Sequence, residues 1–143
     1  MKILLSTTFF VLLLGSSVAA QTTTVGGESR INTTTANRQH QPAAAMDANG
    51  NYVVVWEGQD SDGYGIYGQL YTANGTTNGS EFLINTTTAS DQRFADVAMD
   101  DDGDFIVVWQ AYDQDGDGWG IYAQRFNSSA TAQGSETLLN ATT

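Results

Sequence analysis

The chain of 143 residues carries five lysines and arginines against sixteen aspartates and glutamates, which gives a formal net charge of −11 at pH 7. This charge argues against nucleic acid as a partner, because binding to a phosphate backbone depends on clustered cationic side chains. The chain contains no cysteine, so disulfides, thiolate metal sites and cysteine nucleophiles are excluded. The charge favours divalent cations as partners.

The first twenty residues have the pattern of a secretory signal peptide. Lys2 supplies a positive charge, residues 3–14 are apolar, and the small residues Val18-Ala19-Ala20 precede Gln21. The apolar stretch is too short for a bilayer core about 30 Å thick, and no second hydrophobic segment follows it. We therefore expect a secreted protein, extracellular or periplasmic, with no membrane span. Residues 21–143 are expected to form one domain of modest size.

The sequence after this leader repeats itself at a nearly constant spacing. Ile31-Asn32-Thr33 returns as Ile84-Asn85-Thr86, and Val54-Val55-Trp56 returns as Val107-Val108-Trp109, a shift of 53 positions in both cases. The second copy then gains two residues within one acidic loop. We divide the chain into a first repeat at about residues 27–78, a second at about residues 79–133 and a partial third segment at residues 134–143.

Short apolar segments separated by Gly, Asn and Asp clusters, with no helical period, predict four antiparallel strands in each repeat. We expect the first and second strands at residues 42–46 and 52–56, with copies at residues 95–99 and 105–109. The second strand and its copy are unbroken apolar runs, which predicts a strand covered on both faces. Asn49-Gly50 and Asp102-Gly103 favour a tight hairpin between these strands, since glycine adopts the positive φ that such turns require.

The third strand of each repeat is expected to alternate between two packing surfaces. Tyr67, Gln69 and Tyr71 point to one side, and the residues between them point to the other. The fourth strand is expected at residues 81–85, with echoes at residues 28–32 and 136–140.

The best chemical motif is the acidic loop of the second repeat. Alternate carboxylates at Asp113, Asp115 and Asp117 in a glycine-rich turn can direct several oxygens at one Ca²⁺ ion. The spacing matches the first half of an EF-hand loop, but the position of the bidentate glutamate is occupied by Gln124. The loop also resembles the calcium loops of some propellers, which implies the backbone carbonyl of Trp119 as a further ligand. The alternative is a solvated acidic turn.

The corresponding loop of the first repeat is a weaker candidate for the same ion. It keeps Asp60 and Asp62, but Tyr64 stands where the third carboxylate would be. Asp100, Asp102 and Asp104 also alternate, and a hairpin turn is the interpretation that we favour for them.

Aromatic residues next to polar ones suggest sugar binding as a second possibility. A ring of Trp119, Tyr64, Tyr67 or Tyr122 can stack on a sugar while neighbouring Asp, Gln and Asn groups bind its hydroxyls. The competing interpretation is that these repeated aromatics form the core between repeats.

Catalysis has little support in the sequence. His40 is the single histidine, and we expect it in a loop without a nucleophile or orienting partner. Paired carboxylates such as Asp60 with Asp62 resemble the pair that a glycoside hydrolase needs, and this stays a remote alternative.

Four strands in a repeat of about 50 residues describe a blade of a β-propeller. Further motifs are the run at residues 79–86, the Val97-Ala98-Met99-Asp100 string and the Gly120-Ile121-Tyr122 string. With these, the chain resembles the tandem β-propeller-like repeats of large secreted bacterial adhesins and calcium-binding surface proteins. The resemblance implies an all-β, non-catalytic protein that acts in structure or adhesion, with a glycan or cell-surface ligand.

The chain departs from that pattern by holding only two full repeats and one extra strand segment. Propellers close with about four to eight blades, so two blades leave faces and edges open. Either copies of the chain associate into a homo-oligomer, or the sequence belongs to a longer tandem array. Both explanations stay open, and we favour association.

Overall fold

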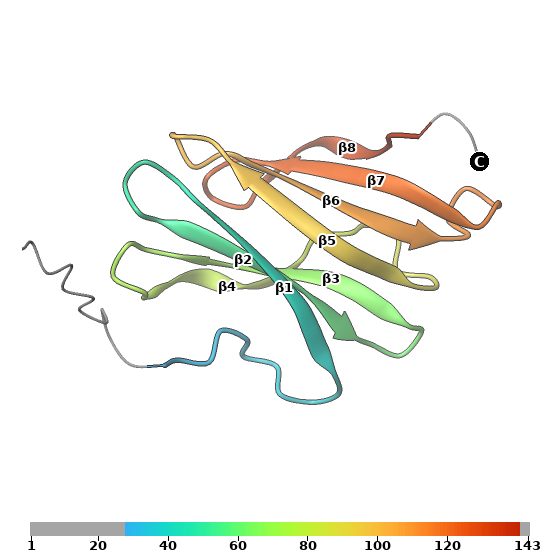
Figure 1. The fold of residues 1–143 in the computed structure, drawn as a ribbon, viewed down its shortest axis with the longest axis horizontal. Coiled ribbons are helices and arrows are strands. Elements are labelled where there is room, and N and C mark those ends of the chain that lie inside the picture. Colours follow the sequence, from blue (N-terminus) through green and yellow to red (C-terminus); the bar gives the residue numbers. More distant parts are fainter. Residues whose placement is uncertain (1–27, 141–143) are drawn as a thin grey trace, which may run out of the picture.

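The computed structural model describes residues 28–140, which form two antiparallel sheets and no helix. The strands are β1 (Gln39–Met46), β2 (Tyr52–Gln59), β3 (Tyr64–Tyr71), β4 (Thr77–Leu83), β5 (Gln92–Met99), β6 (Phe105–Tyr112), β7 (Trp119–Phe126) and β8 (Ala132–Leu138). Strands that follow each other in sequence are paired, in the orders β1-β2-β3-β4 and β5-β6-β7-β8 (Figure 1). The predicted all-β class and the four antiparallel strands of each repeat are confirmed.

The signal peptide expected at residues 1–20 lies outside the described residues. Within residues 28–140 there is no helix with the length and apolar character needed to cross a bilayer.

Glycine and aspartate fix the hairpin between the first two strands of each sheet, as predicted. Gly50 has φ +85° and Gly103 has φ +87°, a region in which other residues are strained. The aspartate that opens each turn, Asp47 or Asp100, accepts hydrogen bonds from two backbone amides of the turn. Of the alternating aspartates in the second turn, Asp100 folds the turn and Asp104 Oδ1 accepts from the Ser128 amide at 3.0 Å, so both have a structural use.

The fourth strand of each sheet begins earlier and ends earlier than predicted. β4 ends at Leu83, and one more backbone bond follows, from the Ile84 amide to the Ile66 carbonyl at 2.8 Å. The ladder then stops because the Ile66 amide donates to a side chain, Asn85 Oδ1, at 2.7 Å. Asn140 accepts from the Ile121 amide in the same way, also at 2.7 Å. The segment that we assigned to a partial third copy thus supplies β8 of the second sheet.

The strand expected at residues 28–32 is absent, and residues 28–38 form an irregular segment. This segment and its copy at residues 84–91 each precede the first strand of a sheet, and we call them linkers. Tyr71 donates a hydrogen bond from its hydroxyl to the carbonyl of Ile31 at 2.6 Å, so the first linker is tied to the outer face of the first sheet.

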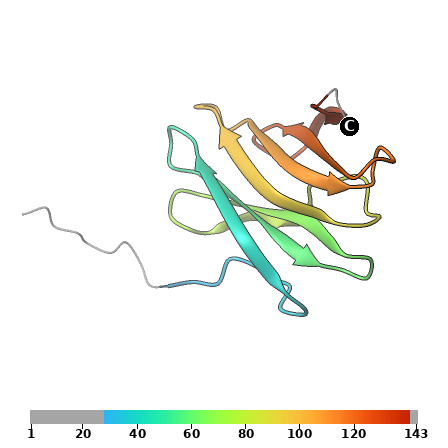
Figure 2. The same cartoon turned by 45° about the vertical axis from the view of Figure 1, so that its right-hand side comes forward.

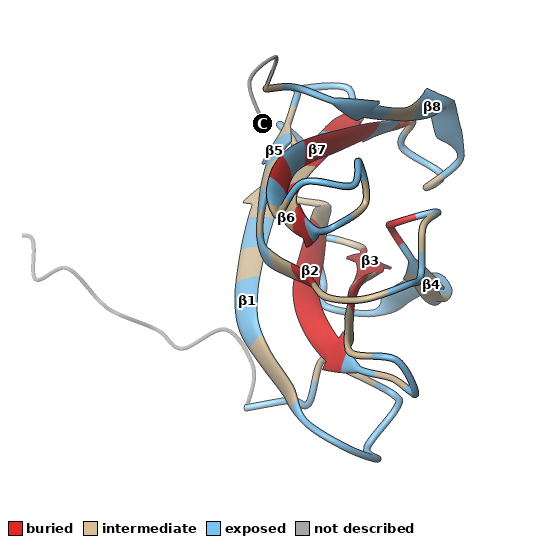
Figure 3. Ribbon diagram, turned by 90° about the vertical axis from the view of Figure 1, so that its right-hand side faces the viewer, coloured by how far each residue is buried: buried red, intermediate tan, exposed pale blue. Residues whose placement is uncertain are grey.

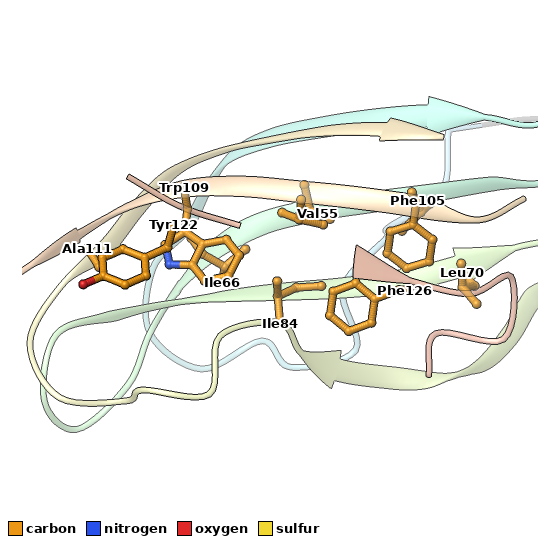
Figure 4. Packing of buried hydrophobic residues seen from close by; sticks show 11 residues of the cluster. Val55, Ile66, Leu70, Ile84, Phe105, Trp109, Ala111, Tyr122 and Phe126 are labelled. Atoms are coloured by element: carbon orange, nitrogen blue, oxygen red, sulfur yellow. The ribbon is translucent and has the colours of Figure 1, made fainter. Parts of the chain in front are cut away.

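The two sheets pack on each other through one apolar core. Figure 4 shows Val55, Ile66 and Leu70 of the first sheet directed toward Phe105, Trp109 and Phe126 of the second, with Ile84 of the second linker between them. β1 and β5 lie side by side at one edge of this contact (Figure 2).

Burial differs between the two copies of the second strand. β2 is buried on both faces from Val53 to Gly58, which confirms the prediction for the first repeat (Figure 3). β6 alternates instead, with Phe105, Val107 and Trp109 buried and Ile106 exposed, so the prediction is wrong for the second repeat. The reason is that one face of the second sheet has no partner among residues 28–140.

Candidate functional site

The junction between the sheets contains a fully buried carboxylate. Glu57 on β2 accepts a hydrogen bond from Arg93 Nε at 3.1 Å and another from the Phe94 amide at 2.6 Å, both on β5. His40 Nδ1 lies 3.4 Å from the same carboxylate. Because a buried carboxylate without partners is costly, these contacts hold the two sheets in one register.

His40 is part of a strand rather than a loop, which corrects the sequence prediction. It pairs with Glu57 across β1 and β2, and a β-bulge follows it before Ala43. The sequence did not predict a strand here because residues 38–41 are polar. The strand partner of His40 is Glu57 on β2, and the burial of Glu57 depends on the second sheet and not on the local sequence.

The bulge of β5 directs a backbone amide at Glu57. Phe94 has φ +57° and is skipped by the pairing between β5 and β6, so its amide is directed away from the sheet. Gln41 occupies the same place in the bulge of β1 and has φ +52°. The two bulges therefore present their amides in the same way.

Tyr64 packs inside this junction. The Arg93 guanidinium lies 4.7 Å from the centroid of the Tyr64 ring, a cation–π contact, and the His40 ring meets Tyr64 edge-on at 5.1 Å. Tyr64 was a candidate for sugar stacking, and the structure uses its ring to order the cation that binds Glu57.

A second carboxylate in each repeat binds the linker that precedes the sheet. Glu81 Oε2 accepts hydrogen bonds from the Thr33 amide at 3.0 Å and the Thr33 hydroxyl at 2.8 Å. Glu136 Oε2 accepts the same two bonds from Thr86, at 2.7 and 2.9 Å. The sequence analysis did not predict this contact, although its signal was present as a threonine and a glutamate that recur together in both repeats.

The hydrogen bonds to Glu81 change its acidity. Burial acts to raise the pKa of Glu81, but the combined hydrogen bonds from Thr33 and Thr34 outweigh it and lower the pKa below its usual value of 4.5. The folded protein therefore prefers the ionised form of this side chain.

The three aspartates of the acidic loop do not surround a common point. The loop is closed by a hydrogen bond of 2.5 Å from the Asp113 amide to the Gly118 carbonyl, and Asp115 Oδ1 accepts from the Asp117 amide at 3.3 Å. Within residues 28–140 no three His, Asp or Glu side chains are grouped so that they can hold one metal ion. Calcium binding by Asp113, Asp115, Asp117 and the Trp119 carbonyl thus stays a prediction.

The loop of the first repeat is also closed as a turn. The Asp60 amide donates to the Gly63 carbonyl at 3.1 Å, and Asp60 Oδ1 accepts from the Asp62 amide at 2.9 Å. Both loops share this use of one carboxylate to fold the turn, and calcium binding at Asp60 and Asp62 is likewise a prediction.

The four aromatic candidates for sugar binding lie in different places. Tyr122 belongs to the core between the sheets, where burial, and then Asp115 and Glu136, raise the pKa of its hydroxyl. Tyr67 is half-buried against the backbone of Gly58.

Trp119 is the candidate that presents its ring to solvent. Its exposed fraction is 45 %, and its ring lies 5.3 Å from that of Tyr112, which is 46 % exposed. This pair stands at the base of the acidic loop, because Tyr112 ends β6 and Trp119 begins β7.

Comparisons with known proteins identify no family. No protein-family model matches the chain, and neither a curated protein nor a solved structure matches it. The functional conclusions therefore depend on the geometry described above.

The Glu81 contact predicts a specific pH dependence of stability. The lowered pKa of Glu81 contributes stability that is present above pH 4.5 and is lost as the pH falls through the pKa of the folded state. Glu81→Gln should therefore be less stable than the wild type at pH 7, and the difference should shrink as the pH falls below about 4.5. Urea unfolding from pH 7 to pH 3 measures this.

Thr33→Val is the matched variant, because it removes the hydroxyl that donates to Glu81 and keeps the side-chain shape. It should lower stability at pH 7 and show a smaller loss than the wild type in acid. A stability difference for Glu81→Gln that stays constant from pH 7 to pH 3 would contradict this account.

Proposed function

We propose that the chain is a secreted, non-catalytic repeat protein that acts as a structural or adhesive module outside the cell. The observation that carries the proposal is the use of the glutamates. Glu81 and Glu136 make equivalent bonds to the two linkers, and Glu57 joins the two sheets. These carboxylates hold the repeats together, which is the role expected of such polar groups in a structural protein built from repeats.

The sheets correspond in this proposal to two neighbouring blades of a propeller-like assembly. Each has four antiparallel strands in sequence order, and the first strands, β1 and β5, lie side by side as the inner strands of adjacent blades do. Successive sheets pack face to face through an apolar core, which supports the comparison.

Calcium is the cofactor that the charge distribution supports. The net charge of −11 and the carboxylates of the acidic loop favour a divalent cation, whose binding would gather Asp113, Asp115 and Asp117. An ion bound only by the folded state would also stabilise the protein.

Calcium titration of the chain without residues 1–20 tests this role. The wild type should release or absorb heat on binding and unfold at a higher temperature with Ca²⁺, whereas Asp115→Ala should lose both effects. Asp101→Ala is the matched control, because it removes the same charge from an exposed hairpin turn and should behave like the wild type. Equal heats for all three proteins, or none for the wild type, would remove calcium from the proposal.

Glycan binding is the second candidate function. It is favoured by the exposed pair of Trp119 and Tyr112, since an aromatic ring beside carboxylates suits the apolar face and hydroxyls of a sugar. Binding to an array of immobilised glycans should be lost in Trp119→Ala and retained in His40→Ala. A wild-type protein that binds no glycan on the array would contradict this candidate and leave the structural role as proposed.

A further inference from the structure

We propose that a second copy of this chain binds the open face of the second sheet, in a head-to-tail contact that repeats the contact between the two sheets of one chain. The inference rests on the proposed role as a repeat assembly and names the partner. It follows from three comparisons between equivalent positions of the two repeats.

The first comparison concerns the face of the second sheet that points away from the core. In the first sheet this face is buried by the second sheet, and Val53, Ile66 and Ile84 are 0 %, 0 % and 2 % exposed. Their copies in the second repeat, Ile106, Ile121 and Leu139, are 37 %, 36 % and 55 % exposed. The second sheet thus has an exposed apolar face of the kind that is buried in the first sheet.

The second comparison concerns the opposite face of the first sheet. On β5, Ala95, Val97 and Met99 pack against the core between the sheets. Their copies on β1 are Pro42, Ala44 and Met46, and all three are exposed. The exposed part of this face is on β1, because Val54 and Trp56 on β2 are already buried, with Ile31 packed against them. Each outer side of the chain thus carries a copy of one half of the internal contact.

A hollow marks the place where the second copy would enter. It has a volume of about 290 Å³ and is lined by Ile31, Pro42, Val54 and Trp56 among others. In the second repeat, Ile84, Ala95, Val107 and Trp109 hold the equivalent positions and pack in one cluster with Val53, Val55 and Ile66. The side chains equivalent to these last three, on the open face, are Ile106, Val108 and Ile121.

The third comparison concerns the polar junction. Inside the chain, Glu57 meets the Arg93 guanidinium, and Arg93 also lies over the ring of Tyr64. The copies of these residues are Gln110, His40 and Trp119, in that order. An ion pair in the internal contact is thus replaced by an amide and an imidazole in the proposed one.

The two partners of the ion pair are both replaced at the positions that would meet in the proposed contact. Gln110 lies beside Ile121 on the open face of the second sheet, and His40 lies on β1, the edge strand of the first sheet, where its ring also contacts Glu57 and Tyr64. Gln110 and His40 would therefore meet only between two copies. Gln110 has no charge, so the proposed contact does not bury a carboxylate that would need the guanidinium of Arg93 as its partner. Gln41, in the bulge of β1, is in position to donate its amide to Gln110 as Phe94 does to Glu57.

The contact is heterologous, because it joins two different faces. Repeated association therefore leads to rings or to filaments. With two sheets per chain, rings of two, three or four copies would contain between four and eight sheets, the range in which propellers close.

Complementary surface variants test the proposal. Ile121→Arg places a charge on the open face of the second sheet, and Met46→Arg does so on the open face of the first sheet. Each variant keeps one intact face. Sedimentation velocity of the chain without residues 1–20, at concentrations up to about 1 mM, measures the mass of each protein alone and of the mixture.

The wild type should associate with rising concentration, and each variant alone should stay monomeric. An equimolar mixture should form a dimer and nothing larger, because the intact face of one variant binds the intact face of the other. Ser129→Arg, in an exposed turn between β7 and β8, is the control and should associate like the wild type. Near-ultraviolet circular dichroism of the monomers checks that each variant is folded.

Two outcomes would overturn the proposal. A wild type that is monomeric at every concentration would show that another protein covers these faces or that they stay open. A mixture of the two variants that stays monomeric while the wild type associates would show a different contact between copies. Neither result removes the proposed binding of calcium or of glycans, which is tested separately.

Discussion

The contact between the two sheets is the interaction on which the rest of the structure depends. Val53, Val55 and Ile66 are completely buried in it, and burial of one such side chain stabilises the fold by about 1.5–3 kcal/mol. The chain contains no cysteine, so disulfides contribute nothing to its stability. Glu57 fixes how the two sheets are oriented relative to each other, because its buried carboxylate needs the hydrogen bonds from Arg93 and from the Phe94 amide on β5. The same packing positions the second linker. Ile84 is buried in the core between the sheets, and Thr86, two residues later, binds Glu136.

The repeats are alike in backbone and unequal in environment. The first sheet is covered on its inner face by the second, while the equivalent face of the second sheet is open. This asymmetry is accompanied by a change at the junction, because Glu57 and Arg93 form an ion pair and their copies are Gln110 and His40. It also places Trp119 in solvent where its counterpart Tyr64 is held in a junction. A difference in function between the two acidic loops would therefore be accompanied by a difference in what surrounds them.

The sequence was sufficient to predict the all-β class, the four strands of each repeat and the hairpin turns, because these depend on local alternation and on glycine at positive φ. It was insufficient wherever a distant residue decides the outcome. His40 reads as a loop residue, yet it pairs with a strand held in place by the other sheet. The apolar run at Phe105 looks identical to the run at Tyr52, and only the position of the neighbouring sheet shows that Ile106 is exposed. The acidic loops were recognisable as turns, whereas their affinity for an ion depends on side-chain convergence that sequence does not encode directly.

One matched pair of substitutions tests the central claim that sheet-on-sheet burial holds this fold together. Ile66 and Ile121 occupy the same position of the repeat on the same type of strand, but only Ile66 is covered by a second sheet. Urea unfolding should be measured at a protein concentration low enough to keep the chain monomeric. Ile66→Ala should then lower the free energy of unfolding by about 2–5 kcal/mol, and Ile121→Ala by about 1 kcal/mol or less. Equal losses at the two positions would contradict the account, because they would show that the contact between the sheets does not distinguish the repeats.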